Sequence, residues 1–430
     1  MLNELRLQHQ QRQFLIAARR LLSERGEANS LGLARELVAR LAALSPASLE
    51  AVFDRLARDF NPDPQAVLAA AQAYADTPDA ERLLALTRLS EPPRQELFRR
   101  LNRAPGATGT LVRLRRALLS GLAKHPEWRS VESDLLHLFS SWFNPGFLQM
   151  RQVDWNSPAQ LLEQIIRHEA VHEIDGWDDL RRRLQPDRRL FAFFHPQLPE
   201  EPLIFVEVAL LPEMPAAIAP LIDKKAPTMA PDKFKVAVFY SISNCEPGLK
   251  GVSLGNFLIK RVAEHLQREI PRLRTFCTLS PIPGFAAWLA RSDEAALAEL
   301  PGLKKAQLER ARAARALLSE ACGGDWARLS QAEPLGRLDE AQQQALQRLA
   351  AVYLVAQTAS PQGDAVARFH LDNGARLERL NPLGNRAPKG LKQSCGMMVN
   401  YLYDLGKIEG HHEAFIQGEI VYSRGVAALL

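Results

Sequence analysis

Cysteine is scarce in this sequence. The four cysteines are widely spaced along 430 residues: Cys245, Cys277, Cys322 and Cys395. No two of them have the CxxC spacing of a zinc ribbon, and the pattern is not that of a small scaffold held by disulfides. We therefore predict four buried free thiols.

Long apolar runs and long basic runs are also missing. The most apolar stretches begin at Leu203 and Val236, and both are far shorter than the roughly 20 residues of a membrane-spanning helix. The 54 Lys and Arg only slightly exceed the 49 Asp and Glu, and no basic run is longer than the three arginines from Arg181. Neither a membrane nor a nucleic acid is therefore predicted as a partner. The polar, amphipathic start of the chain predicts a cytoplasmic protein.

The composition is that of a globular protein, with 47% apolar and 24% charged residues, and the length allows two or three domains. The pattern changes near residue 150. Before that point apolar residues recur at helical spacing, for example from Leu49 to Phe60, after Ser45 as a cap and Pro46 at the first helical position. We predict a helical domain over residues 1–150, with scaffolding or oligomerisation as its role.

After residue 150, helical segments alternate with short runs rich in β-branched and aromatic residues. These runs begin at Leu190, Pro202, Val236, Thr275 and Ala367. They predict strands, including ARFHL from Ala367. The class is therefore α+β, with a mixed domain over residues 151–430 whose Gly- and Pro-rich loops are the expected place for chemistry.

One short motif matches a zinc-enzyme pattern. His168, Glu169 and His172 spell HEAVH, in which two histidines bind zinc and the Glu activates water. The positions at which a metzincin has its later Gly and His hold Asp175 and Asp178 instead. We interpret the segment as a helix end with exposed histidines, and predict no metal site.

A second motif, GVSLG from Gly251 to Gly255, matches the GxSxG pattern of a hydrolase nucleophile, which would be Ser253. A loop separates it from the preceding strand, unlike a nucleophile elbow. A glycine-rich loop that opens a helix also presents free backbone amides to a pyrophosphate, and Lys250 and Lys260 add positive charge. The anion cradle is the favoured interpretation, while the nucleophile and simple helix-capping glycines stay open.

Longer segments resemble malonyl-CoA decarboxylases. They are SSWFNPGFL from Ser140, the stretch from Ser241 to Val262, FCTLSPIPGF from Phe276, ARFHLDNGARLERLN from Ala367 and SCGMMVNYLY from Ser394. The resemblance spans roughly residues 133–403 in matching order and includes the HEAVH segment. Relatives often lack the first of its two histidines, which argues again against zinc.

The resemblance implies a catalytic domain with the acetyltransferase fold of the GNAT superfamily, and conversion of malonyl-CoA to acetyl-CoA and CO2. It assigns the catalytic serine to Ser280 and the catalytic histidine to His370. It also implies a homodimer or homotetramer. No cofactor is expected, because the thioester carbonyl itself accepts the electrons as an enolate.

The resemblance further assigns acyl-CoA binding to one loop and the helix that follows it. The matching positions are Lys250, Gly251, Val252, Ser253, Leu254, Gly255, Asn256 and Ile259. Tyr403 matches a tyrosine near the site, although a plain core position stays open for it. Relatives can have Glu where this chain has Ser253, so no catalytic role is assigned there.

The reaction sets three tasks: to hold the carboxylate out of the carbonyl plane, to stabilise the enolate oxygen, and to deliver a proton to carbon. We expect Ser280 to position the malonyl group and His370, with an ordinary histidine pKa, to donate the proton. Asn373 and backbone amides of the SPIPGF loop are candidates for the enolate oxygen. The alternatives are a GNAT-type acyltransferase and a coenzyme A-binding protein without activity. A turn serine and a core histidine also remain open.

Overall fold

The computed structural model describes residues 2–23, 27–254, 258–358, 360 and 363–430. The chain divides into two compact units. The first unit consists of residues 1–149, 193–203 and 244–254, and the second consists of residues 150–192, 204–243 and 255–430. The boundaries of the two units fall within three strands, β2 (Arg188–His195), β3 (Leu198–Leu211) and β4 (Val236–Asn244), so each of these strands has residues in both units.

Within its described residues, the N-terminal part of the first unit forms eight α-helices. They are α1 (Leu2–Ser23), α2 (Glu27–Ala42), α3 (Pro46–Asp59), α4 (Pro64–Asp76), α5 (Ala80–Ser90), α6 (Pro93–Leu101), α7 (Ala107–Gly121) and α8 (Arg129–Trp142), with 3-10 turns η1 (Pro126–Trp128), η2 (Pro145–Phe147) and η4 (Pro247–Leu249). The predicted start of α3 is confirmed, because the Ser45 hydroxyl accepts a hydrogen bond from the Ser48 N–H at 3.3 Å.

The core of this unit lies between α3, α6, α7 and α8. Phe53, Leu97, Leu111 and Leu135 are each at most 1% exposed. Burying a side chain of this size stabilises a fold by about 1.5–3 kcal/mol. The apolar spacing that predicted these helices is therefore the spacing of their packed faces.

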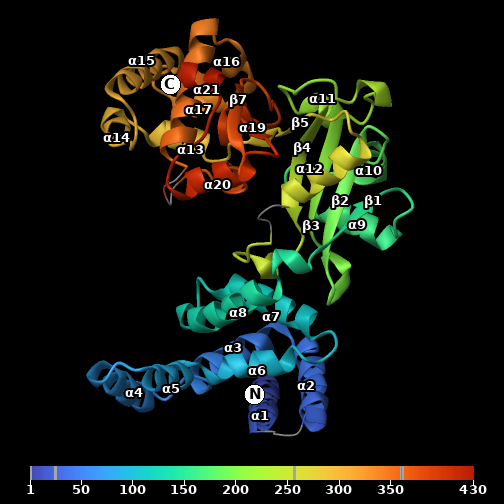
Figure 1. Ribbon diagram of the computed structural model, residues 1–430, viewed down its shortest axis with the longest axis vertical. Helices are drawn as coiled ribbons and strands as arrows, with labels where there is room; N and C mark the ends of the chain where they lie inside the picture. The colour runs from blue at the N-terminus through green and yellow to red at the C-terminus, as the bar shows by residue number, and fades with distance from the viewer. Residues whose placement is uncertain (1, 24–26, 255–257, 359, 361–362) are drawn as a thin grey trace. The chain divides into compact units, whose positions relative to one another are not determined.

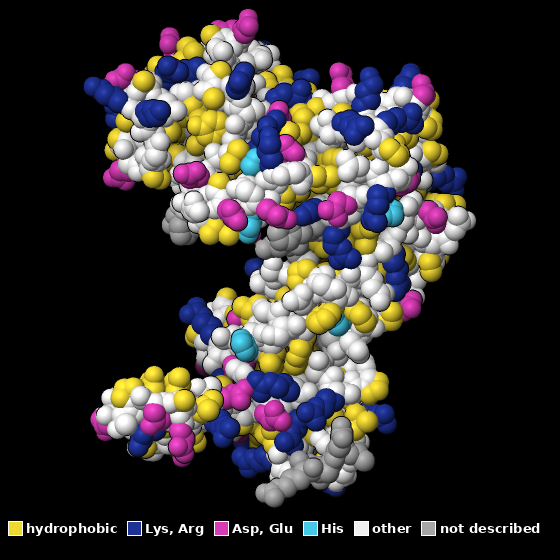
Figure 2. All heavy atoms as spheres, viewed as in Figure 1, with side chains coloured by type: hydrophobic (Ala, Val, Ile, Leu, Met, Phe, Trp, Pro, Cys, Tyr) yellow, Lys and Arg dark blue, Asp and Glu magenta, His cyan; other side chains and the backbone are white. Residues whose placement is uncertain are grey.

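Helices α4 and α5 pack on each other as a hairpin that extends away from the other helices of the first unit (Figure 1). The structure describes every residue of the two helices, and none of them is buried. Leu68, Leu83, Leu84 and Leu89 are 44–63% exposed. Figure 2 shows apolar side chains gathered over this hairpin. These leucines form an exposed apolar surface on the hairpin.

The second unit is built around a mixed sheet. Its strands are β1 (Gln149–Val153), β2 (Arg188–His195), β3 (Leu198–Leu211), β4 (Val236–Asn244), β5 (Thr275–Thr278), β6 (Ser280–Pro281), β7 (Arg376–Asn381) and β8 (Met398–Tyr403). The strand order is β1-β2-β3-β4-β5-β8-β6, and β7 also pairs with β8.

Helices surround this sheet and fill the C-terminal part of the unit. They are α9 (Ala159–His168), α10 (Gly176–Arg183), α11 (Ala219–Ile222), α12 (Leu258–Glu269), α13 (Phe285–Arg291), α14 (Glu294–Ala298), α15 (Lys305–Cys322), α16 (Ala332–Gly336), α17 (Glu340–Ala356), α18 (Ala365–Asp372), α19 (Pro388–Ser394), α20 (Ile408–Ile416) and α21 (Arg424–Leu429), with η3 (Pro231–Lys233) and η5 (Trp326–Ser330). The α12 helix packs on the sheet (Figure 1), where the rings of His265 and Phe191 of β2 lie 5.3 Å apart.

Strands β4 and β5 run parallel, and their ladder covers only the pairs from Val236–Thr275 to Phe239–Thr278. Strand β4 continues to Asn244, whereas β5 ends at Thr278. Strand β8 then takes over, pairing antiparallel with β5, β6 and β7. In sheets with parallel strands, functional groups gather at the carboxyl ends of those strands. Ser280 follows such an end directly.

The α+β class is confirmed, with helices first and a mixed sheet after them. The predicted strands at Leu190, Pro202, Val236 and Thr275 are confirmed as β2 to β5. The four cysteines are free and buried, as predicted. Among the described helices, none is long and apolar enough to cross a membrane.

The strand predicted from Ala367 is wrong, because these residues lie in α18. The Asp364 side chain caps that helix by accepting hydrogen bonds from the N–H groups of Val366 and Ala367, each at 3.0 Å. Gly374, with φ of 77°, follows the helix end in the left-handed region. A cap before the segment and a glycine after it outweigh the weak strand preference of the five residues between them.

Candidate active site

Ser280 is fixed from two directions. Its backbone pairs with Val399 of β8, which sets its place at the end of β5. Its hydroxyl donates to Thr278 Oγ1 at 2.9 Å, and Thr278 Oγ1 also accepts the Tyr401 N–H at 3.2 Å. The serine is 5% exposed. This hydroxyl is therefore held in one direction before any ligand binds.

His370 lies in the last turn of α18 and faces the serine. Its Nε2 lies 3.0 Å from Ser280 Oγ, and its Nδ1 lies 2.9 Å from Tyr403 Oη. The imidazole also stacks on the Tyr401 ring, with 4.7 Å between centroids. The structure thus brings together Ser280, His370 and Tyr403, three residues that are far apart in the sequence.

The hydrogen bonds of this group have one consistent direction. Because the Ser280 hydroxyl donates to Thr278, it accepts the proton of His370 Nε2. His370 Nδ1 then accepts from the Tyr403 hydroxyl. This order assigns a neutral imidazole with its proton on Nε2.

The ordinary pKa expected for His370 is wrong for this structure. Burial lowers the pKa of the imidazole from 6.5 to about 3, because the charged ring would lose its hydration. Burial also raises the pKa of the Tyr403 hydroxyl well above its usual value. Both groups are therefore neutral at pH 7, which agrees with the direction of the hydrogen bonds.

Asn373 has a local bond of its own. Its side-chain N–H donates to the Phe369 carbonyl at 2.7 Å, at the C-terminal end of α18. This bond gives the expected enolate donor a capping role.

A pocket of about 380 Å³ lies beside Tyr403. Its lining also includes Gln267, Arg274, Thr275, Phe276, Leu402, Asp404, Leu405 and Gly406.

The loop assigned to acyl-CoA is anchored within the first unit by Arg115 of α7. Its guanidinium donates to the carbonyls of Gly248 and Lys250 at 2.7 and 2.8 Å, and to Glu132 at 2.6 Å. Arg115 is 1% exposed. The sequence analysis missed it, although an arginine on the apolar stripe of Leu111 and Leu118 signals a buried partner.

The residues of this loop differ in exposure. Val252 and Leu254 are buried, whereas Lys250 and Ser253 are exposed. Gly251 has φ of 83°, a conformation that favours glycine. Ile259 of α12 is 1% exposed and therefore a core residue of the second unit. Gly255 and Asn256 lie outside the described residues.

The hydrolase and zinc interpretations fit the structure poorly. Strand β4 ends at Asn244 and the turn η4 intervenes before Ser253, so there is no direct strand-to-helix elbow. The predicted helix end is confirmed, since α9 ends at His168. The expected exposure of both histidines is wrong, because His172 is buried and His168 is partly buried.

Glu169 explains this burial. Its carboxylate accepts the Ser241 hydroxyl at 2.7 and 2.8 Å, the Ser243 hydroxyl at 3.1 Å, and the N–H groups of Val171 and His172 at 2.8 Å. These bonds hold the segment after α9 on strand β4. A carboxylate with all these donors fixes a loop, and it has little capacity left to activate water.

One other group of potential metal ligands lies close together in the described part of the chain, namely Asp54, His125 and Glu127. His125 Nδ1 already contacts Glu127 at 3.2 Å, and Asp54 accepts the Trp128 indole N–H at 2.9 Å. These internal bonds account for the cluster without an ion.

Comparisons with known proteins give one consistent family. A profile of the malonyl-CoA decarboxylase C-terminal domain matches residues 146–430, and a profile of the N-terminal domain matches residues 60–143. Mitochondrial malonyl-CoA decarboxylases of Anser anser anser and Rattus norvegicus are each 36% identical, over 342 and 338 residues, which is 76% and 73% of this chain. The chain spans 66% of the length of each of these relatives.

Two solved structures cover nearly the whole chain. Malonyl-CoA decarboxylase from Rhodopseudomonas palustris has a TM-score of 0.83 and 46% identity, and covers 97% of this chain and 99% of its own. The protein of that name from Agrobacterium vitis has a TM-score of 0.82 and 45% identity, with the same coverage. The α+β fold of this chain is that of these solved structures. The chain belongs to the malonyl-CoA decarboxylase family.

The buried imidazole predicts loss of stability in acid. Unfolded His370 takes up a proton near pH 6.5, whereas the folded pKa is about 3, so the unfolded state binds more protons between these values. Stability contributed by the neutral ring is complete above pH 6.5 and falls as the pH falls, by at most about 1.4 kcal/mol per pH unit. Urea unfolding of wild type and His370→Asn at pH 7 and pH 5 checks this. The free energy of unfolding should fall less between pH 7 and pH 5 in the variant than in the wild type. An equal fall in both proteins would contradict the neutral buried ring.

Proposed function

We propose that this chain is a carboxy-lyase that converts malonyl-CoA to acetyl-CoA and CO2. The observation that carries the proposal is the buried hydrogen-bonded group of Ser280, His370 and Tyr403 in a member of this family. The bond between the carboxylate and the methylene carbon breaks, and its electron pair enters the thioester carbonyl as an enolate. One proton then adds to the methylene carbon. The reaction balances with malonyl-CoA and that proton.

His370 delivers the proton in this proposal. The malonyl carboxylate is an anion, and an anion bound in a dry site raises the pKa of a neighbouring imidazole. On substrate binding the ring takes up a proton from solvent at Nδ1, and the Tyr403 hydroxyl turns from donor to acceptor of that hydrogen bond. Its Nε2–H faces the Ser280 hydroxyl, which would hold the acyl group, while Tyr403 keeps Nδ1 oriented. Substrate binding therefore changes a neutral ring into the acid.

Ser280 positions the malonyl group. Its hydroxyl proton is directed at Thr278 in this structure, and rotation about its side-chain bond would direct it at the substrate. The position is 5% exposed, so water competes little for the hydroxyl. In such a site a fixed donor stabilises developing negative charge more strongly than it would in water.

The first test of the mechanism is His370→Asn. We expect turnover of malonyl-CoA to fall by about 10²- to 10⁴-fold, because a general acid has been removed. Binding of acetyl-CoA, followed by calorimetry, should change little. Turnover close to wild type would remove His370 from the mechanism.

Ser280→Ala tests the second role. Turnover of the variant should fall, because the serine orients the substrate. The wild-type protein should have no acyl adduct during the reaction, because the serine forms no ester. Intact-protein mass spectrometry during turnover checks for the adduct. A trapped acyl-Ser280 would replace positioning by nucleophilic catalysis.

Incubation of the pure protein with malonyl-CoA alone separates the function classes. A decarboxylase forms acetyl-CoA and CO2 without an acceptor, an acyltransferase releases free coenzyme A only with an acceptor amine, and a coenzyme A sensor gives no product. A hydrolase with Ser253 as its nucleophile would lose its kcat in Ser253→Ala, whereas in the proposed enzyme a change in the acyl-CoA loop would act on the KM and leave the kcat.

We further propose that the loop of residues 250–256 binds acyl-CoA, with no other cofactor. Support comes from the buried Arg115, which fixes the carbonyls of Gly248 and Lys250, and from Gly251 in the left-handed region. A preset loop loses little conformational freedom on binding. The helical part of the first unit would then organise substrate binding as well as assembly.

Arg115→Met tests this anchoring. We expect the KM for malonyl-CoA to rise at least about tenfold with a smaller change in kcat, because the loop loses its fixed conformation before binding. Arg129→Met, at an exposed arginine of α8, is the matched control and should leave both constants unchanged. A normal KM in Arg115→Met would contradict the role of the loop.

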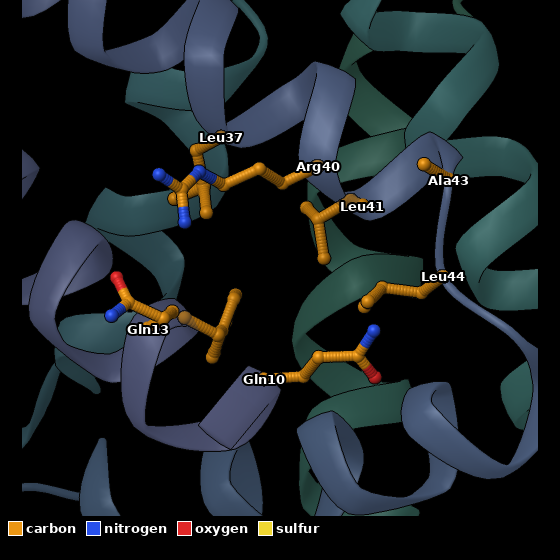
Figure 3. A pocket seen from close by; sticks show the side chains of 8 residues that line it. Gln10, Gln13, Leu37, Arg40, Leu41, Ala43 and Leu44 are labelled. Carbon is orange, nitrogen blue, oxygen red and sulfur yellow. The ribbon is translucent and has the colours of Figure 1, made fainter. Parts of the chain in front are cut away.

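We propose that the protein is a homodimer or homotetramer assembled through its helical part. Support comes from the exposed leucines of the α4–α5 hairpin and from an apolar pocket of about 270 Å³ at α1 and α2. Figure 3 shows Leu41, Leu44 and Gln10 around this pocket. It is also lined by Gln13, Phe14, Leu37, Arg40 and Ala43. A second copy of the chain would cover these surfaces.

Charges on the hairpin should weaken this assembly. The double variant Leu68→Glu, Leu84→Glu is expected to shift the protein toward monomer at micromolar concentration, because the buried apolar area would be lost. Light scattering during size-exclusion chromatography measures the mass. Gln65→Glu adds a charge at an exposed polar position of α4 and should not change the mass. A wild-type monomer would remove the proposal.

A further inference from the structure

A single buried carboxylate connects the segment of Ser280 to the segment of His370. Asp364 is 2% exposed and precedes α18. One oxygen, Oδ1, accepts the N–H groups of Val366 and Ala367 at 3.0 Å each. The other oxygen, Oδ2, accepts the N–H of Gly284 at 3.1 Å. The two oxygens of one side chain thus bond to segments 80 residues apart in the sequence.

The connected segments are those that carry the catalytic pair. Gly284 follows Ser280 by four residues and precedes α13 as its N-cap, and His370 follows Asp364 by six residues in α18. The contact between Ser280 Oγ and His370 Nε2 at 3.0 Å joins the same two segments at another point. The two segments are therefore joined at two points: by the contact between Ser280 and His370, and by the bond of the Asp364 carboxylate to the Gly284 N–H.

The surroundings leave the Gly284 peptide little freedom. A Cβ on Gly284 would lie 2.1 Å from Tyr353 Oη and 3.5 Å from Asp364 Oδ2, so only glycine fits there. Tyr353 of α17 is itself buried. Water has little access to a bond in these surroundings, and the loss of one partner leaves the other unsatisfied. Burial raises the pKa of Asp364, and the three N–H groups that it accepts act in the opposite direction.

We propose that Asp364 is a positioning residue, which holds the Ser280 segment at the working distance from His370. The inference rests on the proposed function of these two residues. Asp364 does not touch the reacting atoms, and it acts through the peptide of Gly284 and the start of α18. A displacement of about 1 Å between catalytic groups lowers turnover up to about 100-fold.

Asp364→Asn separates the two bonds of the carboxylate. Asparagine caps helices as well as aspartate does, so its Oδ1 keeps the bonds to Val366 and Ala367. Its amide nitrogen is a donor, and it then faces the N–H donor of Gly284. The helix that carries His370 is therefore retained while the link to the serine segment is lost. In Asp364→Ser the serine hydroxyl caps α18 in place of the carboxylate, and its side chain is too short to reach Gly284.

We expect both variants to lower kcat by about 10- to 100-fold while the KM stays within about threefold and the Tm changes by a few degrees. The ¹⁵N shifts of the His370 imidazole should also change, because its Nε2 bond to Ser280 depends on the link. Asp339→Asn is the matched control: Asp339 caps α17 by accepting the Gln342 N–H at 2.8 Å and is exposed. That variant should match the wild type in all four readouts.

The outcomes distinguish this inference from the proposed function. Wild-type kcat and ¹⁵N shifts in Asp364→Asn, with His370→Asn inactive, would overturn the role of Asp364 and leave the function intact. An active His370→Asn would overturn the function itself. A joint loss of Tm, substrate affinity and kcat in both Asp364 variants would mean general structural support and would also overturn positioning.

Discussion

Exclusion of water from the ring of His370 is the constraint on which the rest of the site depends. His370 as a whole residue is only 4% exposed, and each nitrogen of a buried imidazole needs a partner. Ser280 and Tyr403 are those partners, at 3.0 and 2.9 Å. Because both are hydroxyl groups, they satisfy a neutral ring without adding charge. In the proposed mechanism the same ring takes up a proton once an anionic acyl group is beside it.

Strand β8 sets the geometry of these partners. Tyr403 pairs with Phe276 of β5, and Val399 pairs with Ser280 of β6, so one strand fixes both neighbours of the imidazole. Tyr401 lies two residues before Tyr403, so both side chains are on the same face of the sheet, and the Tyr401 ring stacks on the imidazole. A slip of one residue in this register would turn both tyrosines to the opposite face of the sheet. The register of β8 is therefore part of the site and not only of the fold.

Local patterns predicted the parts of the structure that have local causes. The start of α3 depends on Ser45 and on the apolar spacing after it, and both are visible in sequence. Three features with distant causes were missed or misjudged. The burial of His172 depends on serines of β4 about 70 residues away, the low pKa of His370 depends on its packed surroundings, and the anchoring of the Lys250 loop depends on Arg115, about 135 residues away. Ser280 and His370 were singled out only through family resemblance, and the contact between them was not predicted.

Buried carboxylates are a further kind of contact between distant segments that local sequence patterns do not reveal. Glu169 and Asp364 are buried carboxylates that accept several N–H or O–H donors from segments distant in sequence. A buried anion costs free energy unless such donors surround it, so each one fixes the backbone of every segment that donates to it. The proposed catalytic pair of neutral groups has no strong charge to hold its own geometry. In the proposal for Asp364, directional bonds provide that order from outside the pair, because the carboxylate binds the two segments rather than the side chains of Ser280 and His370.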